Sequence, residues 1–131
     1  MGSTREKIRR FLESGPVAVA GASRDRSKFG NRVLLHYLRA GWDAHPVNPR
    51  EDEIEGRRAY PDLASLPAGV RGLSIVTPPA ITERLVEEAA EAGIRLLWMQ
   101  PGAESARAVA RAEELGLDCI HGGPCVLVEL S

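Results

Sequence analysis

One polar segment, residues 21–30, carries three cationic side chains within five positions. Arg24, Arg26 and Lys28 follow Gly21-Ala22-Ser23, and Asn31 stands where a helix could begin. Glycine permits a tight turn close to a ligand, and cations beside the free N–H groups of a helix N-terminus favour phosphate. The spacing matches neither the G-x-G-x-x-G dinucleotide motif nor the G-x-x-x-x-G-K-S/T phosphate loop. The segment therefore predicts an anion site, with a solvated cationic loop as the alternative.

Small, polar or cationic residues also follow three later apolar runs. They are Asn48-Pro49-Arg50, Thr77-Pro78-Pro79 and Gln100-Pro101-Gly102. Open α/β sheets bind ligands at the carboxyl ends of their strands, so these segments predict one nucleotide site. An NAD site usually has an acidic residue after the second strand, and neither Asn48 nor Arg50 is acidic. NAD is therefore disfavoured, whereas NADP, a 3′-phosphorylated nucleotide such as CoA, or a simple Asn-Pro turn stays open.

Apolar runs without alternation predict parallel strands that are buried on both faces. Helical spacing of apolar residues between the runs predicts crossover helices, and the capping-box pair Ser3 and Glu6 predicts another helix within residues 1–15. Pro46 indicates an edge or late position for the second strand. The predicted strands are Val17–Ala20, Asp43–Val47, Leu73–Val76, Arg95–Met99 and Asp118–Ile120.

The alternation of strands and helices predicts an α/β fold. We expect a single doubly wound, Rossmann-like domain over residues 1–131. Its sheet would be five-stranded and mainly parallel, with helices on both faces, because parallel strands need long crossovers. The strand order expected for such a domain is 3-2-1-4-5.

The composition is that of one globular domain with nearly balanced charge. The chain has 131 residues, of which 44% are hydrophobic, and a formal net charge of -1. A dedicated nucleic-acid or polyanionic-membrane binder would show a basic excess, so neither class is expected. No apolar run approaches the ~18 residues of a membrane span. Two cysteines, Cys119 and Cys125, are too few for a disulfide framework, which favours a cytoplasmic protein with reduced thiols.

The titratable residues predict no catalytic group. His36 falls in a predicted helix and His45 in a strand, and no acid is placed to orient His121 near the predicted cleft. Cys119, His121 and Cys125 could in principle bind zinc, but they lack a fourth ligand and a C-x-x-C spacing. The sequence therefore predicts neither a catalytic residue nor a metal site.

The strand-end motifs together resemble those of the small CoA-binding-domain proteins. These are similar to the N-terminal CoA-binding domain of the succinyl-CoA synthetase alpha subunit, and the resemblance runs from Val17 to Glu129. Its specific parts are Val47-Asn48-Pro49 and the pattern Trp98-x-Gln100-x-Gly102. The other marks are Val19-Ala20-Gly21-Ala22-Ser23, Tyr37-Leu38, Gly56 with Tyr60-Pro61, Pro78, Ala92-Gly93 and Cys125–Glu129. One departure is Pro124, which stands where family members usually carry an arginine.

The resemblance implies a site for the nucleotide part of CoA at the carboxyl ends of the strands. The residues of this site fall into four groups, one for each part of the ligand. Arg50 would be the cation that pairs with the 3′-phosphate. The implied contacts are Gly21, Ala22, Ser23 and Arg24 for the diphosphate; Asn48, Pro49 and Arg50 for the 3′-phosphate region; Thr77 and Pro78 for the middle of the ligand; and Met99 and Gln100 for the pantetheine. Arg26 and Lys28 join the predicted site as the other cations of the first loop.

In the synthetases, catalysis needs a phosphorylated histidine in a second domain, for which this chain has no room. The resemblance therefore implies non-catalytic binding of CoA or an acyl-CoA, with a homodimer or an unidentified protein partner left open. One alternative is an NADP-binding oxidoreductase-like domain, which would need a substrate domain. Another is a regulatory module that senses CoA through a mixed disulfide with Cys125. A small buried thiol is the simpler interpretation of that residue.

Overall fold

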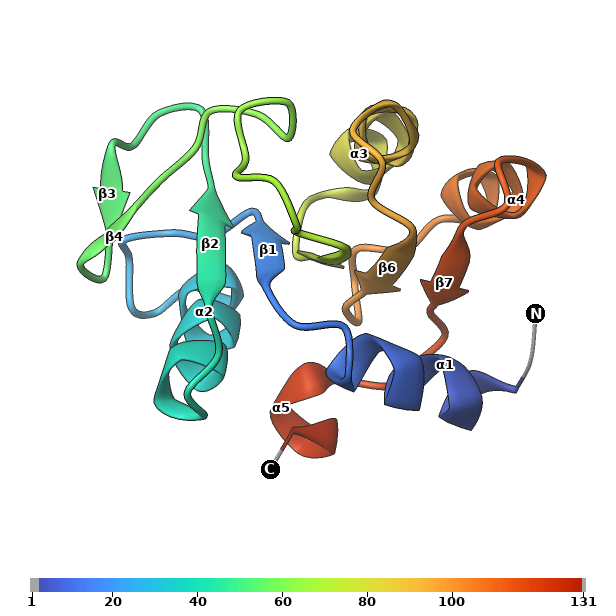
Figure 1. The fold of residues 1–131 in the computed structure, drawn as a ribbon, viewed down its shortest axis with the longest axis horizontal. Coiled ribbons are helices and arrows are strands. Elements are labelled where there is room, and N and C mark those ends of the chain that lie inside the picture. The colour runs from blue at the N-terminus through green and yellow to red at the C-terminus, as the bar shows by residue number, and fades with distance from the viewer. Residues whose placement is uncertain (1–2, 131) are drawn as a thin grey trace.

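Five short apolar runs form one sheet in the computed structural model, which describes residues 3–130 (Figure 1). All neighbouring strands in this sheet are parallel, as predicted. Positions 1, 2 and 131 of the predicted domain lie outside the described residues. The strands are β1 (Val17–Ala20), β2 (Ala44–Val47), β5 (Gly72–Ile75), β6 (Leu96–Met99) and β7 (Asp118–Ile120).

Helices cover both faces of the sheet, which confirms the predicted α/β class (Figure 1). The face that carries α3 and α4 lies opposite the face that carries the other three helices. The helices are α1 (Thr4–Leu12), α2 (Phe29–Arg39), α3 (Pro79–Glu91), α4 (Ala106–Glu114) and α5 (Val126–Glu129).

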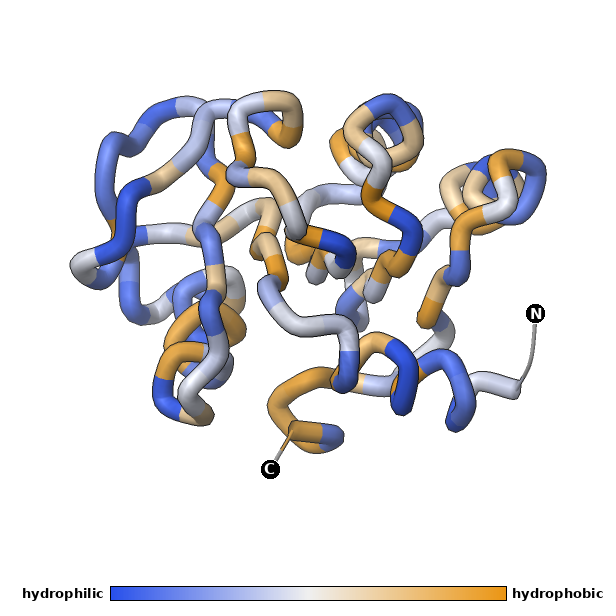
Figure 2. The backbone as a smooth tube through the Cα atoms, viewed as in Figure 1, coloured by the Kyte–Doolittle hydropathy of each residue, from blue (hydrophilic) through white to orange (hydrophobic). Residues whose placement is uncertain are grey.

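Two apolar cores result because successive strand residues point to opposite faces. Ala18 and Ala20 pack with residues of α3 and α4, whereas Val17 and Val19 pack with residues of α1, α2 and α5. Trp98 belongs to the second core, where its ring meets that of Phe11 edge-on at a centroid distance of 5.3 Å. Figure 2 shows the apolar strand segments inside the molecule and a strongly polar chain around β3 and β4.

The predicted strand order is wrong. The sheet runs β2-β1-β5-β6-β7, which is 2-1-3-4-5 when only its own strands are counted, instead of 3-2-1-4-5. The predicted order would place the second strand inside the sheet, where Pro46 would lack a ladder donor. Instead β2 lies at the edge, and the Pro46 carbonyl accepts a 2.9 Å hydrogen bond from Tyr60 on its outer side. The proline nitrogen faces the same outer side, so the edge position that Pro46 indicated is confirmed.

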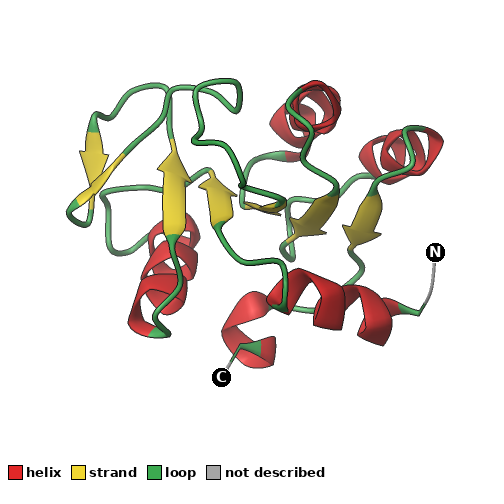
Figure 3. Cartoon of the chain, viewed as in Figure 1, coloured by secondary structure: helices red, strands yellow, loops and turns green. Residues whose placement is uncertain are grey.

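No helix spans the connection from β2 to β5 (Figure 3). This segment instead forms a small antiparallel hairpin, β3 (Glu53–Ile54) and β4 (Arg57–Arg58). The predicted order required the chain to continue to the outer side of β2, whereas after the hairpin it crosses to the other side of β1, where β5 pairs. The hairpin lies outside the five-stranded sheet and brings Glu55 and Gly56 to its turn.

The predicted N-cap residue is confirmed for α1 and is wrong for α2. Ser3 caps α1 by accepting a 3.1 Å hydrogen bond from the Glu6 N–H, as the capping box predicted. The next helix begins at Phe29, with Lys28 as its N-cap, so Asn31 does not cap it. Asn31 lies in the first turn of α2, and its side chain is fully buried.

Candidate functional site

The strand register brings the four predicted loop segments to one edge of the sheet. Ala20, the last residue of β1, pairs with Val47 on one side and with Ile75 on the other, and Ile75 pairs with Met99. The segments that follow these residues therefore start side by side at the carboxyl edge. Parallel sheets bind ligands at this edge.

Two glycines allow close packing where β1 ends. Gly21 has φ +88°, and a Cβ there would lie 2.5 Å from the Val76 carbonyl oxygen. A Cβ on Gly30 would lie only 2.0 Å from the Gly21 carbonyl oxygen. The segment after β1, residues 21–24 (the β1 turn), therefore packs against both the end of β5 and the start of α2. Glycines of dinucleotide-binding turns allow the same tight turn and close helix–strand packing, although their spacing is shorter than in this chain.

Two buried or half-buried asparagines hold consecutive carbonyl groups of the β1 turn. Asn48 Nδ2 donates to the Ala22 oxygen at 2.9 Å, and Asn31 Nδ2 donates to the Ser23 oxygen at 2.9 Å. The peptides are trans, so the N–H of Ser23 and the N–H of Arg24 point opposite to those carbonyls. Neither N–H has an acceptor among residues 3–130. The turn therefore presents two free backbone donors, which suit an anion.

The cations near this turn differ in how far carboxylates neutralise them. Arg26 forms a two-pronged pair with Glu55, at 3.0 Å from Nε and 2.9 Å from Nη2. Arg24 is exposed and lies 3.7 Å from Glu51. Lys28 and Arg50 form no ion pair with a carboxylate in the described part of the chain. Lys28 and Arg50 are therefore the cations at this edge that are freest to meet a ligand phosphate.

Asn48 also shapes the second segment. Its Oδ1 accepts a 2.8 Å hydrogen bond from the Arg50 N–H, while its Nδ2 holds the Ala22 carbonyl. One side chain thus joins the segment after β2 to the segment after β1. Pro49 and Arg50 are exposed beyond it, as a ligand contact requires.

Thr77 and Pro78 lie at the end of β5, in line with their predicted position. The Thr77 hydroxyl is 2.8 Å from the hydroxyl of Thr82, a buried residue of α3. Pro78 is exposed and precedes α3 as its N-cap residue. Thr77 lies next to the β1 turn, because a Cβ on Gly21 would lie 3.1 Å from the Thr77 Cγ2.

Met99 and Gln100 are placed differently from the other predicted site residues. Both side chains are fully buried. Gln100 donates from Nε2 to the Ser74 hydroxyl at 3.0 Å and accepts the Val126 N–H at 2.9 Å, so it anchors α5. Met99 packs in the core beneath α3 and α4. The structure therefore does not bring these two side chains to the ligand edge, and we leave them out of the proposed contacts.

Sequence reasoning missed Asn31 and Glu55. Asn31 was expected to cap a helix, and Glu55 belongs to an acidic run that gives no signal of a partner. In the structure, three hydrogen bonds from Arg26 and Asn31 reach the Glu55 carboxylate. The Arg26 and Asn31 hydrogen bonds and the Arg26 charge lower the pKa of Glu55 to about 2. The sequence contained no clear signal of this contact, because Glu55-Gly56 is not one of the dipeptides that favour a tight hairpin turn.

Contacts occupy both ring nitrogens of His45. His45 is nearly buried, with Nε2 at 3.3 Å from an Asp43 carboxylate oxygen and Nδ1 at 3.4 Å from Arg57 Nη2. Both ring nitrogens are therefore engaged. Within residues 3–130, His, Cys, Asp and Glu side chains form no group of three that could hold a metal ion.

The two thiols are expected to differ in reactivity. Burial raises the pKa of Cys119 in β7 to about 12, so its reactive thiolate is scarce at neutral pH. Cys125, the N-cap residue of α5, is half-buried.

We expect a disulfide reagent to modify Cys125 first in the folded protein, and mass spectrometry of the digested adduct would locate it. Modification of Cys119 before Cys125 would contradict this expectation, and Cys125→Ser provides the unlabelled control.

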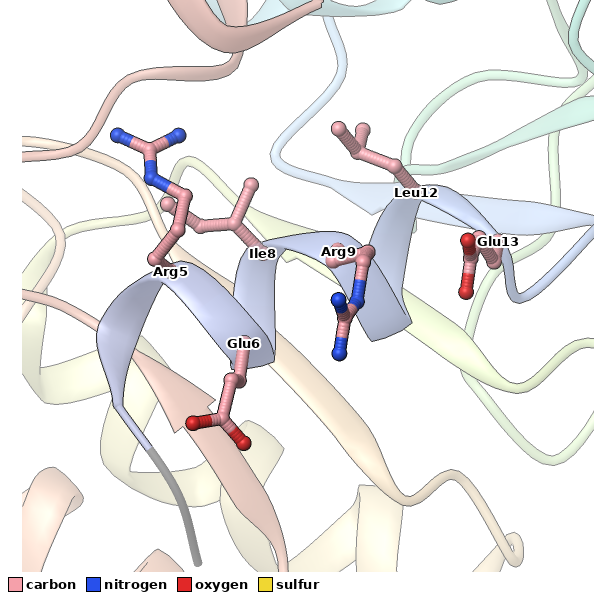
Figure 4. Close-up of a pocket in the computed structure, with 6 residues that line it drawn as sticks. All are labelled: Arg5, Glu6, Ile8, Arg9, Leu12 and Glu13. Atoms are coloured by element: carbon pink, nitrogen blue, oxygen red, sulfur yellow. The ribbon is translucent and has the colours of Figure 1, made fainter.

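A surface hollow of about 360 Å³ lies along α1, away from the carboxyl edge (Figure 4). Figure 4 shows Arg5 extending on the same side of this helix as Ile8 and Leu12, and Glu6 and Arg9 on the opposite side. None of the predicted site residues lines it. Its lining residues are Arg5, Glu6, Ile8, Arg9, Leu12 and Glu13.

Comparisons with known proteins give a consistent result. Residues 16–131 match the family model described as "CoA binding domain". The chain is 33% identical over 86 residues to the alpha subunit of ADP-forming acetate–CoA ligase II from Pyrococcus furiosus, covering 65% of this chain and 19% of that subunit. The match therefore spans about one fifth of the length of that relative.

Two solved structures extend the likeness to three dimensions. A conserved hypothetical protein from Pyrococcus furiosus has a TM-score of 0.84 and 39% identity, covering 88% of this chain and 98% of that one. Acetyl-coenzyme A synthetase 1 of Ca. Korarchaeum cryptofilum, in complex with phosphate and ADP, has a TM-score of 0.78 and 27% identity, covering 88% of this chain and 27% of that one.

Among the described helices of this chain, none is long and apolar enough to cross a membrane.

Proposed function

Because this chain belongs to the CoA-binding-domain family, we propose that it binds CoA or an acyl-CoA through the nucleotide part without itself catalysing a reaction. The family match and the CoA-ligase relatives support CoA as the ligand. The observation that carries the proposed mode of binding is the pair of free N–H groups on Ser23 and Arg24. They lie at the carboxyl edge, between the start of α2 and the segment that holds Arg50.

The diphosphate occupies the β1 turn in this proposal. The N–H groups of Ser23 and Arg24 donate to its oxygens, and the positive end of the α2 dipole, with Lys28 as N-cap, stabilises its charge. Gly21 and Ala22 allow the backbone to approach the ligand closely. No side chain in this arrangement needs to move a proton or attack the ligand, which agrees with a binding role.

The 3′-phosphate lies beside the segment after β2, with Arg50 as its cation and Asn48 and Pro49 as the neighbouring wall. Asn48 fixes the position of this segment through the Arg50 N–H. Thr77 and Pro78 pack against the middle of the ligand. An arginine suits an added phosphate at this place in the sheet, whereas an acidic residue suits a free ribose.

Arg50→Ala is expected to weaken CoA binding about tenfold and to leave dephospho-CoA binding nearly unchanged, because only CoA carries the 3′-phosphate that Arg50 pairs with. Isothermal titration of both ligands measures the two ratios. Arg84→Ala, on the exposed side of α3, is the matched control and should change neither affinity. Equal losses for CoA and dephospho-CoA would refute the role given to Arg50.

Absence of catalysis is testable with the chemistry of the ligase relatives. The purified chain, incubated with acetyl-CoA, ADP and phosphate, is expected to produce no ATP above the level of a protein-free sample. Isothermal titration of the same sample should still show CoA binding. A missing ATP signal then cannot be explained by a misfolded protein. ATP formation that depends on the chain would overturn the non-catalytic proposal.

A further inference from the structure

Glu55 is held in an uncommon backbone conformation at the turn of the β3–β4 hairpin. Its φ of 52° and the φ of 78° at Gly56 give two consecutive left-handed residues between the paired residues Ile54 and Arg57. This is the geometry of a type I′ hairpin turn, for which Asn-Gly is the favoured sequence and glutamate is not. The preference of the turn therefore does not explain why a glutamate stands at position 55.

The Glu55 carboxylate points back to the β1 turn and is almost enclosed there. Arg26 donates to both of its oxygens at 3.0 and 2.9 Å, and Asn31 Nδ2 donates at 2.8 Å. Its side chain keeps only 11% of its surface exposed. The hydrogen bonds from Arg26 and Asn31 lower the pKa of Glu55 to about 2, so the carboxylate is ionised at neutral pH.

Asn31 connects this carboxylate to the free backbone donors. Its Nδ2 donates to both Glu55 and the Ser23 carbonyl, so both amide hydrogens are used and the orientation of the buried amide is fixed. The Ser23 carbonyl belongs to the same peptide group as the Arg24 N–H. Loss of the Glu55 acceptor would leave a buried Asn31 hydrogen unpaired and would free the amide to rotate.

We propose that Glu55 is a positioning residue for the proposed diphosphate site, acting through Asn31 on the Ser23–Arg24 peptide. The inference rests on the proposed function. In this arrangement Arg26 holds Glu55 in place and is not the phosphate cation, although it belongs to the cationic loop. The hairpin thus sets the direction of a donor that lies on another segment of the chain.

Two substitutions at Glu55 test the inference. Glu55→Gln keeps the shape but removes the charge and leaves one acceptor oxygen for three donors. Glu55→Asn shortens the side chain away from Asn31 while introducing the favoured Asn-Gly turn. We expect both to weaken CoA and dephospho-CoA about tenfold and by the same factor, because the diphosphate is common to both ligands. In Glu55→Asn the favoured turn offsets part of the stability that is lost with the carboxylate contacts. The melting temperature of each variant, measured beside the wild type, establishes that the protein is folded at the titration temperature.

Glu87→Gln is the matched control, because Glu87 forms a similar two-pronged pair with Arg111 between α3 and α4. It should leave both affinities unchanged. The backbone amide signals of Ser23 and Arg24 in NMR spectra of the free protein should shift in the Glu55 variants and not in Glu87→Gln. This readout needs no ligand.

The outcomes separate the two proposals. Unshifted Ser23 and Arg24 amides, or affinities in the Glu55 variants equal to or higher than wild type, would overturn the positioning role while leaving CoA binding intact. Higher affinity would show that Glu55 competes with phosphate for Arg26. A wild-type chain that binds neither CoA nor ADP would overturn the proposed function, and the NMR comparison would still decide whether Glu55 orients the turn.

Discussion

Replacing Gly30 by alanine is expected to abolish measurable CoA binding and to lower the free energy of unfolding by about 3 kcal/mol. The added Cβ would meet the Gly21 carbonyl oxygen at 2.0 Å and its carbon at 2.9 Å. Both atoms are backbone, so no flexible side chain can move aside. The start of α2 would have to shift from the β1 turn and would displace the Ser23 and Arg24 donors. In a helix, alanine is more favourable than glycine by ~1 kcal/mol. A lower free energy of unfolding in Gly30→Ala would therefore come from the steric contact and not from helix propensity.

Chemical denaturation and titration with CoA measure the two effects. Gly93→Ala is the control, since Gly93 has φ +79° but open space around its Cα. That variant should show the backbone strain of an alanine at positive φ, about 1 kcal/mol, and normal CoA binding. Wild-type affinity in Gly30→Ala would contradict the packing that we describe between the β1 turn and α2.

Asn48→Ala is expected to weaken CoA and dephospho-CoA about a hundredfold and to lower the free energy of unfolding by about 2 kcal/mol. The side chain makes two hydrogen bonds that no other residue replaces, to the Ala22 carbonyl and from the Arg50 N–H. The first sets the Ser23 N–H for the diphosphate, and the second sets the segment for the 3′-phosphate. Both parts of the proposed site would therefore loosen together.

Asn48→Asp separates the two hydrogen bonds in the same position. Aspartate keeps the acceptor for the Arg50 N–H but loses the donor to Ala22, and its charge repels a nearby phosphate. Its loss of affinity should equal or exceed that of alanine. If either variant weakened CoA while dephospho-CoA bound normally, Asn48 would act on the 3′-phosphate alone and its link to the β1 turn would carry no function.

The strands could be predicted because their apolar runs are buried on both faces by any doubly wound arrangement. The order of the strands depends on which side of β1 the chain reaches after β2. The segment between β2 and β5 has no periodic pattern of apolar residues that would predict this side. Pro46 contained the needed information, since a proline whose nitrogen faces outward belongs at an edge. The expected order 3-2-1-4-5 ignored it.

The candidate site was predictable to the level of position along the chain. The rule for strand ends predicted that Gly21, Asn48 and Thr77 lie at one edge, and the strand register brings their segments together there. The family resemblance implied that Met99 and Gln100 meet the ligand, but a resemblance carries over positions and not the direction of side chains, and both side chains are buried.

The contacts that hold the β1 turn were beyond sequence reasoning for another reason. Asn31 and Glu55 meet across 24 positions of the chain, through a hairpin that the sequence did not reveal. Arg26 looked like a phosphate cation because its partner Glu55 lies 29 positions away. Local spacing cannot indicate which cation of a loop is already neutralised.

The central claim is that this chain binds CoA through its nucleotide part at the carboxyl edge of the sheet. Isothermal titration of the wild-type protein with CoA, dephospho-CoA, NADP and NAD tests it most directly. We expect CoA to bind most tightly, dephospho-CoA about tenfold more weakly, and NADP and NAD weaker still. Tight binding of NADP with no detectable binding of CoA would contradict the account.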